Sequence, residues 1–294
     1  GHEKDTDKPV IISTWQSLYK LDKKYFENFG CVVGDEAHLF KSKSLTAIMT
    51  KLINCKYRFG MTGTLDGTQT HRLVLEGLFG KVEKVTSTKQ LMDKDTLANL
   101  KIKCLVLKHK EEDCKVVKDL KYSDELQYIV THKTRNDFIS RLCDKLSGNT
   151  LCLYQLVEKH GLVLYNLMKD FDRKVFFIHG GTDTNDREKI RAITEEQTNA
   201  IIVASYGTFS TGINIRNLHN IVFASPSKSR IRVLQSIGRG LRKSDKGDIQ
   251  TTLLDIADDF TYKDNKNFTL NHFLERINIY NEEEFDYEID RIRI

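Results

Sequence analysis

Proline is nearly absent from this sequence, with 2 residues among 294, and no stretch is of low complexity or repeats itself. These absences exclude a tandem-repeat array and a set of domains joined by long, low-complexity linkers. No apolar run reaches the roughly 20 residues of a membrane-spanning helix. The sequence also contains no G-x-x-x-x-G-K-[ST] segment, the loop that cradles nucleotide phosphates in many ATPases.

Cysteine is present but forms no recognisable pattern. None of the six cysteines belongs to a C-x-x-C pair, and no group of histidines completes a zinc-binding spacing. Several cysteines stand inside apolar runs, as buried free thiols do, which favours a reducing compartment. The formal net charge is +5, so a charged, solvated surface explains the composition, and a polyanionic partner is compatible with it without being required.

Short apolar runs alternate with longer amphipathic segments, which is typical of α/β proteins. The apolar runs are rich in valine, isoleucine and phenylalanine without alternation, and they predict parallel strands covered on both faces. The predicted strands are Val10–Thr14, Cys31–Asp35, Tyr57–Thr62, Ile102–Leu107, Thr150–Tyr154, Lys174–His179, Ala200–Ala204, Asn220–Ala224 and Thr251–Asp255. The predicted helices are Ser42–Ile53, Ser123–Leu146, Glu158–Asp170, Asp186–Glu196, Ile231–Leu241 and Leu270–Asn281.

The polar stretch Lys108–Asp119 interrupts this rhythm, and we place a domain boundary there, between residues 1–115 and 116–294. The second block holds enough elements for a complete open α/β domain, followed by a C-terminal helix and a solvated acidic tail, Asn281–Asp290. The first block leads at once into a buried strand, so we expect its sheet to be incomplete.

Asp35 and Glu36 lie where a predicted buried strand ends. Because ligands bind beyond the carboxyl ends of parallel strands, one carboxylate can hold hydrated Mg²⁺ on nucleotide phosphates and its neighbour can orient a water molecule. A polar strand end with two solvated acids is the alternative. Thr62-Gly63-Thr64 ends the next strand and would lie beside the acids, either as a relay of nucleotide state or as an ordinary glycine turn.

Two later segments also suit phosphate groups. Gln235–Arg242 is predicted to be helical, with Arg239 and Arg242 three residues apart on one face, where they can clamp a triphosphate or simply face solvent. Residues 204–214 are rich in glycine and hydroxyl groups, which suit a nucleotide or a nucleic-acid backbone as well as an ordinary loop.

Two other strand ends carry weaker signals. Trp15, the only tryptophan, can stack on a base, although packing in a core or between domains is the simpler interpretation. Gly180 ends another predicted strand, and a glycine there lets a backbone approach closely, although loop chemistry explains it equally well.

In this order, the motifs resemble those of superfamily 2 helicases and translocases, which have two RecA-like lobes. Asp35-Glu36-Ala37-His38 resembles motif II, Thr62-Gly63-Thr64 motif III, Leu151–His160 motif IV, Ser205–Asn214 motif V and Gln235–Arg242 motif VI. The amino-acid sequences of residues 12–17, 204–207 and 235–239 most resemble those of the phage UvsW-like recombination and repair helicases and their XPB-like relatives. The resemblance covers nearly the whole chain.

The resemblance implies ATP hydrolysis with Mg²⁺ in the cleft between the lobes, coupled to movement along DNA. It assigns Mg²⁺ binding through water to Asp35, with Glu36 beside it, and activation of the attacking water to Glu36. It implies that Gln235, Arg239 and Arg242 contact the γ-phosphate and that Gly212 and Asn214 lie near the nucleotide. It implies that His38, Thr62 and Thr64 couple the ATP site to DNA binding. The residues that it implies in DNA contact are Thr14, Trp15, Gly180 and Ser205. Contacts to the DNA backbone give affinity without sequence preference.

Members of this family carry a phosphate loop and motif Ia upstream of motif II, and this sequence begins after both. We therefore expect the C-terminal portion of a DNA helicase for recombination, repair or fork processing, in bacterial or phage-infected cytoplasm, with a phosphate-loop segment as its partner. Without that loop we expect weak ATP binding and poor hydrolysis. Two alternatives remain open, namely a nucleic-acid- or protein-binding module without ATPase activity and the motor subunit of a restriction–modification system.

Overall fold

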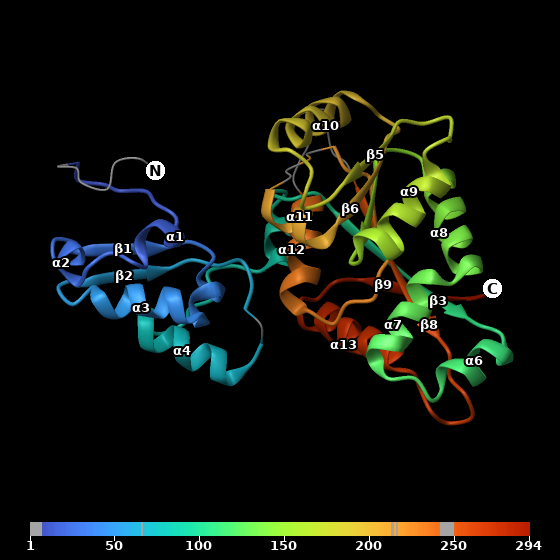
Figure 1. The fold of residues 1–294 in the computed structure, drawn as a ribbon, viewed down its shortest axis with the longest axis horizontal. Helices are drawn as coiled ribbons and strands as arrows, with labels where there is room; N and C mark the ends of the chain where they lie inside the picture. The colour runs from blue at the N-terminus through green and yellow to red at the C-terminus, as the bar shows by residue number, and fades with distance from the viewer. Residues whose placement is uncertain (1–7, 66, 213–214, 216, 242–249) are drawn as a thin grey trace. The chain divides into compact units, whose positions relative to one another are not determined.

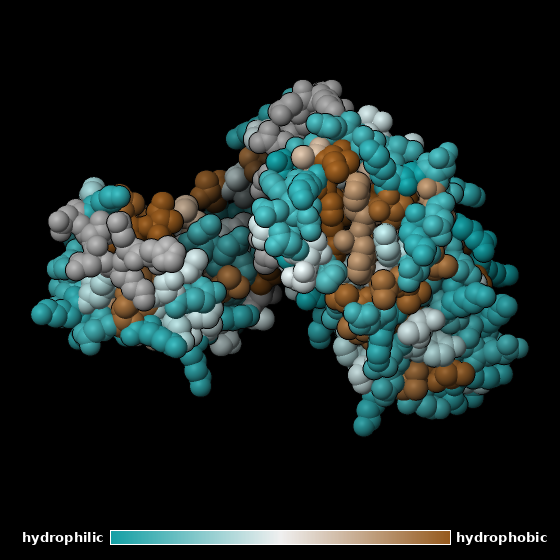
Figure 2. All heavy atoms as spheres, turned by 45° about the horizontal axis from the view of Figure 1, so that its top comes forward, coloured by the Kyte–Doolittle hydropathy of each residue, from teal (hydrophilic) through white to brown (hydrophobic). Residues whose placement is uncertain are grey.

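The computed structural model describes residues 8–65, 67–212, 215, 217–241 and 250–294. The chain divides into two compact units, Gly1–Val85 (unit 1) and Thr86–Ile294 (unit 2), and each has its own parallel sheet (Figure 1). The α/β class with parallel sheets is thus confirmed. Among the described residues, no helix has both the length and the apolar character needed to span a membrane. In the view of Figure 2 the surface is mostly hydrophilic, and apolar side chains gather in separate patches.

Unit 1 contains a two-stranded sheet. Its elements are α1 (Trp15–Leu18), α2 (Lys23–Phe26), β1 (Cys31–Gly34), the 3-10 helix η1 (Ala37–Lys41), α3 (Lys43–Lys51), β2 (Tyr57–Gly60) and α4 (Gln69–Phe79). Buried side chains of the helices, with Phe26, Phe40 and Met49 among them, form its core. Val33 and Phe59 on the strands are more than half exposed, so the prediction that these strands are covered on both faces is wrong for the described residues. Val10–Thr14 forms no strand.

Unit 2 is built on a seven-stranded sheet with the order β5-β6-β4-β7-β8-β3-β9, in which all neighbours are parallel. The strands are β3 (Leu100–Lys108), β4 (Thr150–Tyr154), β5 (Val175–Ile178), β6 (Ile201–Ser205), β7 (Asn220–Phe223), β8 (Thr251–Asp259) and β9 (Tyr287–Arg293). The helices are α5 (Thr88–Asp93), α6 (Glu111–Val117), α7 (Tyr122–Thr131), α8 (Lys133–Lys145), the π-helix η2 (Val157–Gly161), α9 (Leu162–Met168), α10 (Thr184–Glu196), α11 (Tyr206–Gly212), α12 (Arg230–Gly240) and α13 (Phe268–Glu282).

Apolar cores cover both faces of this sheet. Along β6, Ile201 and Val203 pack into one core with α8 and α9, whereas Ile202 and Ala204 pack into the other with α11, α12 and α13 (Figure 1). Because successive strand residues point to opposite faces, both sets must be apolar. This explains the unbroken apolar runs from which these strands were predicted. All six cysteines are free, and five of them are buried.

The structure differs from the sequence-based domain division in two places. It separates the units between Val85 and Thr86 rather than near residue 115, because β3 pairs with β8 and β9 and so belongs to the sheet of unit 2. The predicted solvated tail continues from α13 into β9, which forms the edge of that sheet beside β3. The polar stretch after β3 folds into α6, which buries Cys114 and Val117.

Among the described residues of unit 2, two arginines form ion pairs in the interior, and both have their acid on β8. Arg276 donates three hydrogen bonds to the carboxylate of Asp255, at 2.8–3.1 Å. Arg135 donates from Nε to both oxygens of Asp258, at 2.8 and 2.9 Å. Burial by itself would raise the pKa of Asp258, but the Arg135 charge and the hydrogen bond with His109 outweigh it and hold that pKa well below its usual range.

Replacing Arg276 by Met should lower the free energy of unfolding by about 3–5 kcal/mol, because Asp255 would remain buried without its countercharge. Urea denaturation followed by circular dichroism measures this change. The double variant with Asp255→Leu should recover much of the loss. Lys189→Ala, which breaks an exposed pair with Asp186, should change stability by less than about 0.5 kcal/mol. Equal losses in Arg276→Met and Lys189→Ala would contradict this account.

Candidate functional site

The ends of β1 and β2 lie side by side in unit 1. The two strands pair in register, with Gly34 opposite Gly60. Beyond them, the amide of Met61 donates to the carbonyl of Gly34 and the amide of Ala37 donates to the carbonyl of Met61, both at 2.9 Å. The structure therefore places the acids that follow β1 next to the threonines that follow β2.

The backbone turns sharply at the two acids. Glu36 has φ +49° and ψ +49°, in the left-handed region that non-glycine residues rarely occupy. Its amide donates to Asp35 Oδ1 at 2.8 Å, which supports the turn. Asp35 is exposed, and the Glu36 side chain is 47% exposed, so both carboxylates can meet a ligand at the strand end. Left-handed residues held in this way are frequent at functional sites.

A chain of close polar contacts joins Glu36 to the end of β2 through His38. Nδ1 of the buried His38 lies 2.9 Å from Thr62 Oγ1 and 3.3 Å from Glu36 Oε2. The Thr62 hydroxyl donates to the carbonyl of Thr64 at 2.9 Å, so it accepts from His38, whose proton is then on Nδ1. Direct contacts thus connect the Glu36 carboxylate to Thr62 and, through its hydroxyl, to Thr64.

Two glycines allow the tight packing beneath these residues. A Cβ atom on Gly34 would lie 2.8 Å from Phe40 Cζ and 3.0 Å from Phe79 Cζ. A Cβ atom on Gly60 would lie 2.9 Å from the Phe79 ring. The two phenylalanine rings pack edge to face, with their centroids 5.0 Å apart. The ends of β1 and β2 are therefore held against an aromatic core that has no room for a larger residue.

The predicted arginine helix of unit 2 is α12. Val233 and Ile237 are buried in the core, while Gln235 is half-buried on the other side of the helix. Arg239 lies in α12, and its side chain is outside what the structure describes. Arg242 lies outside the described residues. The structure thus confirms that residues 230–240 are helical and leaves the arrangement of the two guanidinium groups as an expectation.

The hydroxyl-rich segment after β6 forms α11. Ser205 Oγ lies 2.7 Å from Thr208 Oγ1 and accepts from the Thr208 amide at 3.3 Å, so Ser205 caps this helix. Gly212 is the last residue of α11, and Asn214 lies outside the described residues. The role of Ser205 that is visible in the structure is therefore a local cap.

The ends of three neighbouring strands also share hydrogen bonds. Ser225, just after β7, accepts from the amide of Gln155 at 3.0 Å, and its hydroxyl lies 2.8 Å from Nδ1 of His160. Tyr206 donates to the carbonyl of Ser225 at 3.0 Å. Burial and the nearby Arg135 charge lower the pKa of His160 well below its usual range. The segment resembling motif IV is thereby tied, with a neutral histidine, to the loop after β7.

The remaining predicted contacts lie at the surface of their own units. Gly180 is exposed after β5, and its carbonyl accepts from Arg187 at 2.9 Å. Thr14 is exposed and precedes α1. Trp15 is 37% exposed and packs against Tyr19, with ring centroids 5.7 Å apart, so it is not buried in the core of unit 1. The interpretation of Trp15 as a core residue is therefore wrong.

Known proteins share both halves of this arrangement. A family model described as "Type III restriction enzyme, res subunit" matches residues 1–67, and one described as "Helicase conserved C-terminal domain" matches residues 134–244. LlaBIII, an ATP-dependent Type ISP restriction–modification enzyme bound to DNA, has a similar fold (TM-score 0.63, 14% identity, 95% of this chain and 23% of that chain). So does S. cerevisiae Dbp5 bound to RNA and ADP BeF3 (TM-score 0.54, 15% identity, 90% and 59%).

The two family models and the ordered motifs confirm the resemblance to the superfamily 2 helicases, and the matching structures show the same RecA-like fold. Within this class it is similar to UvsW of Enterobacteria phage T4, named an ATP-dependent DNA helicase, with 34% identity over 301 residues. That alignment covers 98% of this chain and 60% of the length of UvsW. The crystal structure of T4 UvsW matches with a TM-score of 0.59, over 98% of this chain and 58% of that chain. The resemblance inferred from the motifs is confirmed.

Gly34→Ala should destabilise unit 1 by about 1–3 kcal/mol, because the added methyl group meets two aromatic rings that cannot both move aside. Urea denaturation followed by the fluorescence of Trp15 measures this, since the only tryptophan lies in unit 1. Gly30→Ala is the matched control, because nothing lies within 4 Å of its added Cβ. Unfolding midpoints that shift equally in the two variants would show that the close packing at Gly34 is not needed.

Proposed function

We propose that this chain forms part of the motor of an ATP-dependent DNA helicase. The observation that carries the proposal is Glu36, a half-exposed carboxylate at a strand end that is joined through His38 to Thr62 on the neighbouring strand end. A carboxylate in this place can accept a proton from water, and the polar contacts behind it can pass the state of the nucleotide to Thr62. The similarity to a protein named an ATP-dependent DNA helicase supports the assignment.

We assign a separate role to each acid. Asp35 is exposed and would bind Mg²⁺ through water molecules, as carboxylates at nucleotide sites do. Mg²⁺ would neutralise charge on the nucleotide phosphates. Glu36 would orient and deprotonate the attacking water, because its carboxylate is accessible and its backbone is fixed by the turn and by the contact with His38.

We propose that α12, together with Arg242 after it in the sequence, stabilises the negative charge that develops on the γ-phosphate during hydrolysis. Gln235 would contact the γ-phosphate, and Arg239 and Arg242 would act as arginine fingers, since a guanidinium group binds phosphate oxygens in bidentate fashion. Gly212 and Asn214, around the end of α11, would lie near the nucleotide.

The substrate we propose is DNA, bound through its backbone. Thr14, Ser205 and Gly180 would contact phosphates with hydroxyl and amide groups, and the partly exposed ring of Trp15 would stack on a base. Such contacts give no sequence preference, which a protein that moves along DNA requires. By similarity to UvsW, we propose a role in recombination, repair or fork processing in the cytoplasm of a bacterium or an infected host.

We propose that a phosphate loop outside these 294 residues completes the ATP site. The 294 residues contain no G-x-x-x-x-G-K-[ST] segment, and nothing among the assigned residues replaces the lysine and amides that hold the β- and γ-phosphates. We therefore propose that this chain alone binds ATP weakly and hydrolyses it poorly. A version extended upstream to include a phosphate loop would be active.

One alternative has an observation in its favour. The match of residues 1–67 to a restriction-enzyme family model is compatible with a motor subunit of a restriction–modification system. That protein would cleave DNA in an ATP-dependent reaction when its other domains are present. A helicase would instead separate strands and leave the DNA intact, so incubation with plasmid DNA and with a forked duplex distinguishes the two.

In the extended protein, Arg239→Ala and Arg242→Ala should each lower the steady-state ATPase rate by about 10³-fold or more, as loss of an arginine finger does. Arg191→Ala is the matched control, because that arginine pairs with Glu188 and Glu195 on the surface of α10, and its rate should stay at the wild-type value. Rates are measured without nucleic acid, with DNA and with RNA, and DNA should stimulate most. Equal rates in all three variants would refute the proposed role of α12, and stimulation by RNA alone would refute the substrate.

A further inference from the structure

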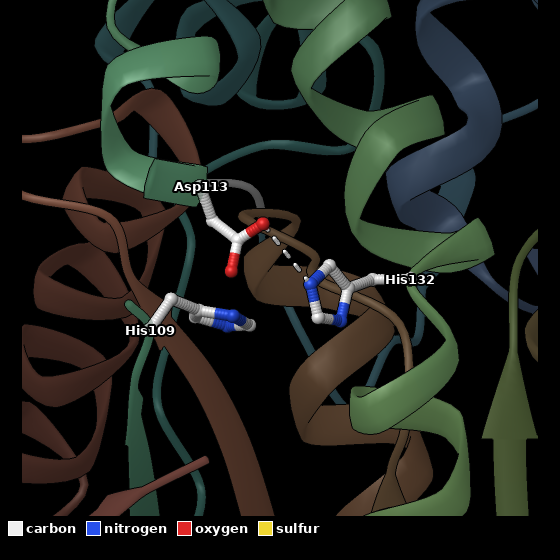
Figure 3. Close-up of side chains that lie close together, drawn as sticks. All are labelled: His109, Asp113 and His132. Carbon is white, nitrogen blue, oxygen red and sulfur yellow. Dashed lines mark ion pairs between the residues drawn. The ribbon is translucent and has the colours of Figure 1, made fainter. Parts of the chain in front are cut away.

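Three side chains with metal-binding atoms meet at one end of the sheet in unit 2 (Figure 3). His109 follows β3, Asp113 lies in α6, and His132 lies between α7 and α8. One ligand atom from each lies within 4.8 Å of the other two. The sequence predicts no histidine-containing zinc pattern, because His132 is distant along the chain and joins the other two only in the fold.

His109 presents a buried nitrogen atom without a partner. Its Nε2 lies 3.0 Å from Oδ1 of Asp258, the acid that is paired with Arg135. A carboxylate in such a pair only accepts hydrogen bonds, so His109 carries its proton on Nε2. Nδ1 is left as a buried lone pair with no hydrogen-bond partner among the described residues. Buried polar atoms are nearly always satisfied, so this one indicates a missing ligand.

Asp113 and His132 open the cluster to solvent. Their side chains are 24% and 15% exposed, whereas the side chain of His109 is fully buried. Tyr128 donates to Asp113 Oδ1 at 2.6 Å, and His132 Nε2 lies 3.6 Å from the same oxygen. The other Asp113 oxygen points toward His109 in Figure 3. An ion can therefore enter past Asp113 and His132 and reach the buried nitrogen.

We propose that His109 Nδ1, Asp113 and His132 Nε2 bind a zinc ion. Two imidazole nitrogens and one carboxylate oxygen, with water in the fourth position, form a donor set typical of zinc, whereas Mg²⁺ prefers oxygen ligands. The bond from His109 Nε2 to Asp258 is the outer contact that fixes the tautomer and ring orientation of a metal-binding histidine. Ligand atoms around tetrahedral zinc lie roughly 3.3 Å apart. Side-chain rotations that move each ligand atom by about 1 Å would therefore complete the site.

Zinc binding should break the hydrogen bond from the Arg135 amide to His132, and hydrogen exchange can follow this loss. Nδ1 of His132 accepts from the amide of Arg135 at 3.3 Å and so caps α8, which places the ring proton on Nε2. Coordination releases the Nε2 proton, and Nδ1 takes one up. The cap from the Arg135 amide is then lost. The site exchanges this long hydrogen bond for a metal ion that joins β3, α6 and the α7–α8 junction.

The test titrates the full chain, first stripped with a chelator, with zinc chloride against a competing indicator. We expect one zinc ion per chain, tetrahedral Co²⁺ absorption when cobalt replaces zinc, and no displacement by excess Mg²⁺. Loss of an outer contact weakens metal binding by about 10–100-fold. Asp113→Asn and His132→Gln each remove a ligand, so each should weaken zinc binding by more than that. Hydrogen exchange at the Arg135 amide should become faster in wild-type protein when zinc is added.

Two control variants separate ligand loss from general damage. His179→Gln removes a half-buried histidine outside the cluster and should bind zinc as wild type does. Tyr128→Phe keeps all three ligands and removes only an outer hydrogen bond to Asp113, so it should weaken zinc binding by no more than about 10–100-fold. Melting curves without zinc establish whether each variant is folded. If a variant is unfolded, hydrogen exchange at the Arg135 amide of the wild-type protein tests the proposal instead. Folded wild type that binds no zinc, or unchanged affinity in Asp113→Asn and His132→Gln, would overturn the proposal. The assay contains neither nucleotide nor DNA, so its result is independent of the proposed motor function.

Discussion

Two buried ion pairs with acids of a single strand hold in place the segment of unit 2 that leads into α12, residues 224–229. Asp255 and Asp258 of β8 each hold an arginine, and each arginine also donates to a backbone carbonyl of the segment that leads into α12. Arg276 reaches the carbonyl of Ser227 at 2.9 Å, and Arg135 reaches that of Ala224 at 2.7 Å. Because a buried charge without its partner is strongly destabilising, this segment has little freedom to move. The helix that carries Gln235 and Arg239 is therefore positioned by charge as well as by apolar packing.

Unit 1 positions its own functional residues with weaker but closely spaced contacts. The strand ends are held by backbone hydrogen bonds and by phenylalanine rings that touch two glycines. Glu36 stays accessible while its backbone and its link to His38 are fixed. This combination suits the proposed site, in which an accessible carboxylate would act as the base and the rigid contacts behind it would respond to the change. In both units the sheet supplies the rigid part, and the residues that follow its strands supply the proposed functional groups.

The sequence predicts those parts of the fold that depend on local patterns. Thr150–Tyr154 was predicted with the bounds of β4, because an apolar run buried on both faces is recognisable by itself. Tyr287–Arg293 was not, because its charged residues form a strand only by pairing with β3 at the sheet edge. In the same way, the sequence predicts that Asp35 and Glu36 lie at a strand end, and the structure places them directly after β1. The cluster of His109, Asp113 and His132 was missed, because only the fold brings its members together.

The central claim is that Glu36 performs the chemical step at the end of β1, and single-turnover hydrolysis of ATP by Glu36→Gln in the extended protein tests it most directly. The amide keeps the size of the side chain but cannot accept a proton from water, so Mg·ATP should bind with nearly wild-type affinity. The hydrolysis step should slow by about 10²–10⁴-fold, the usual contribution of a general base. Hydrolysis at the wild-type rate with ATP fully bound would show that Glu36 is not the base and would contradict the account.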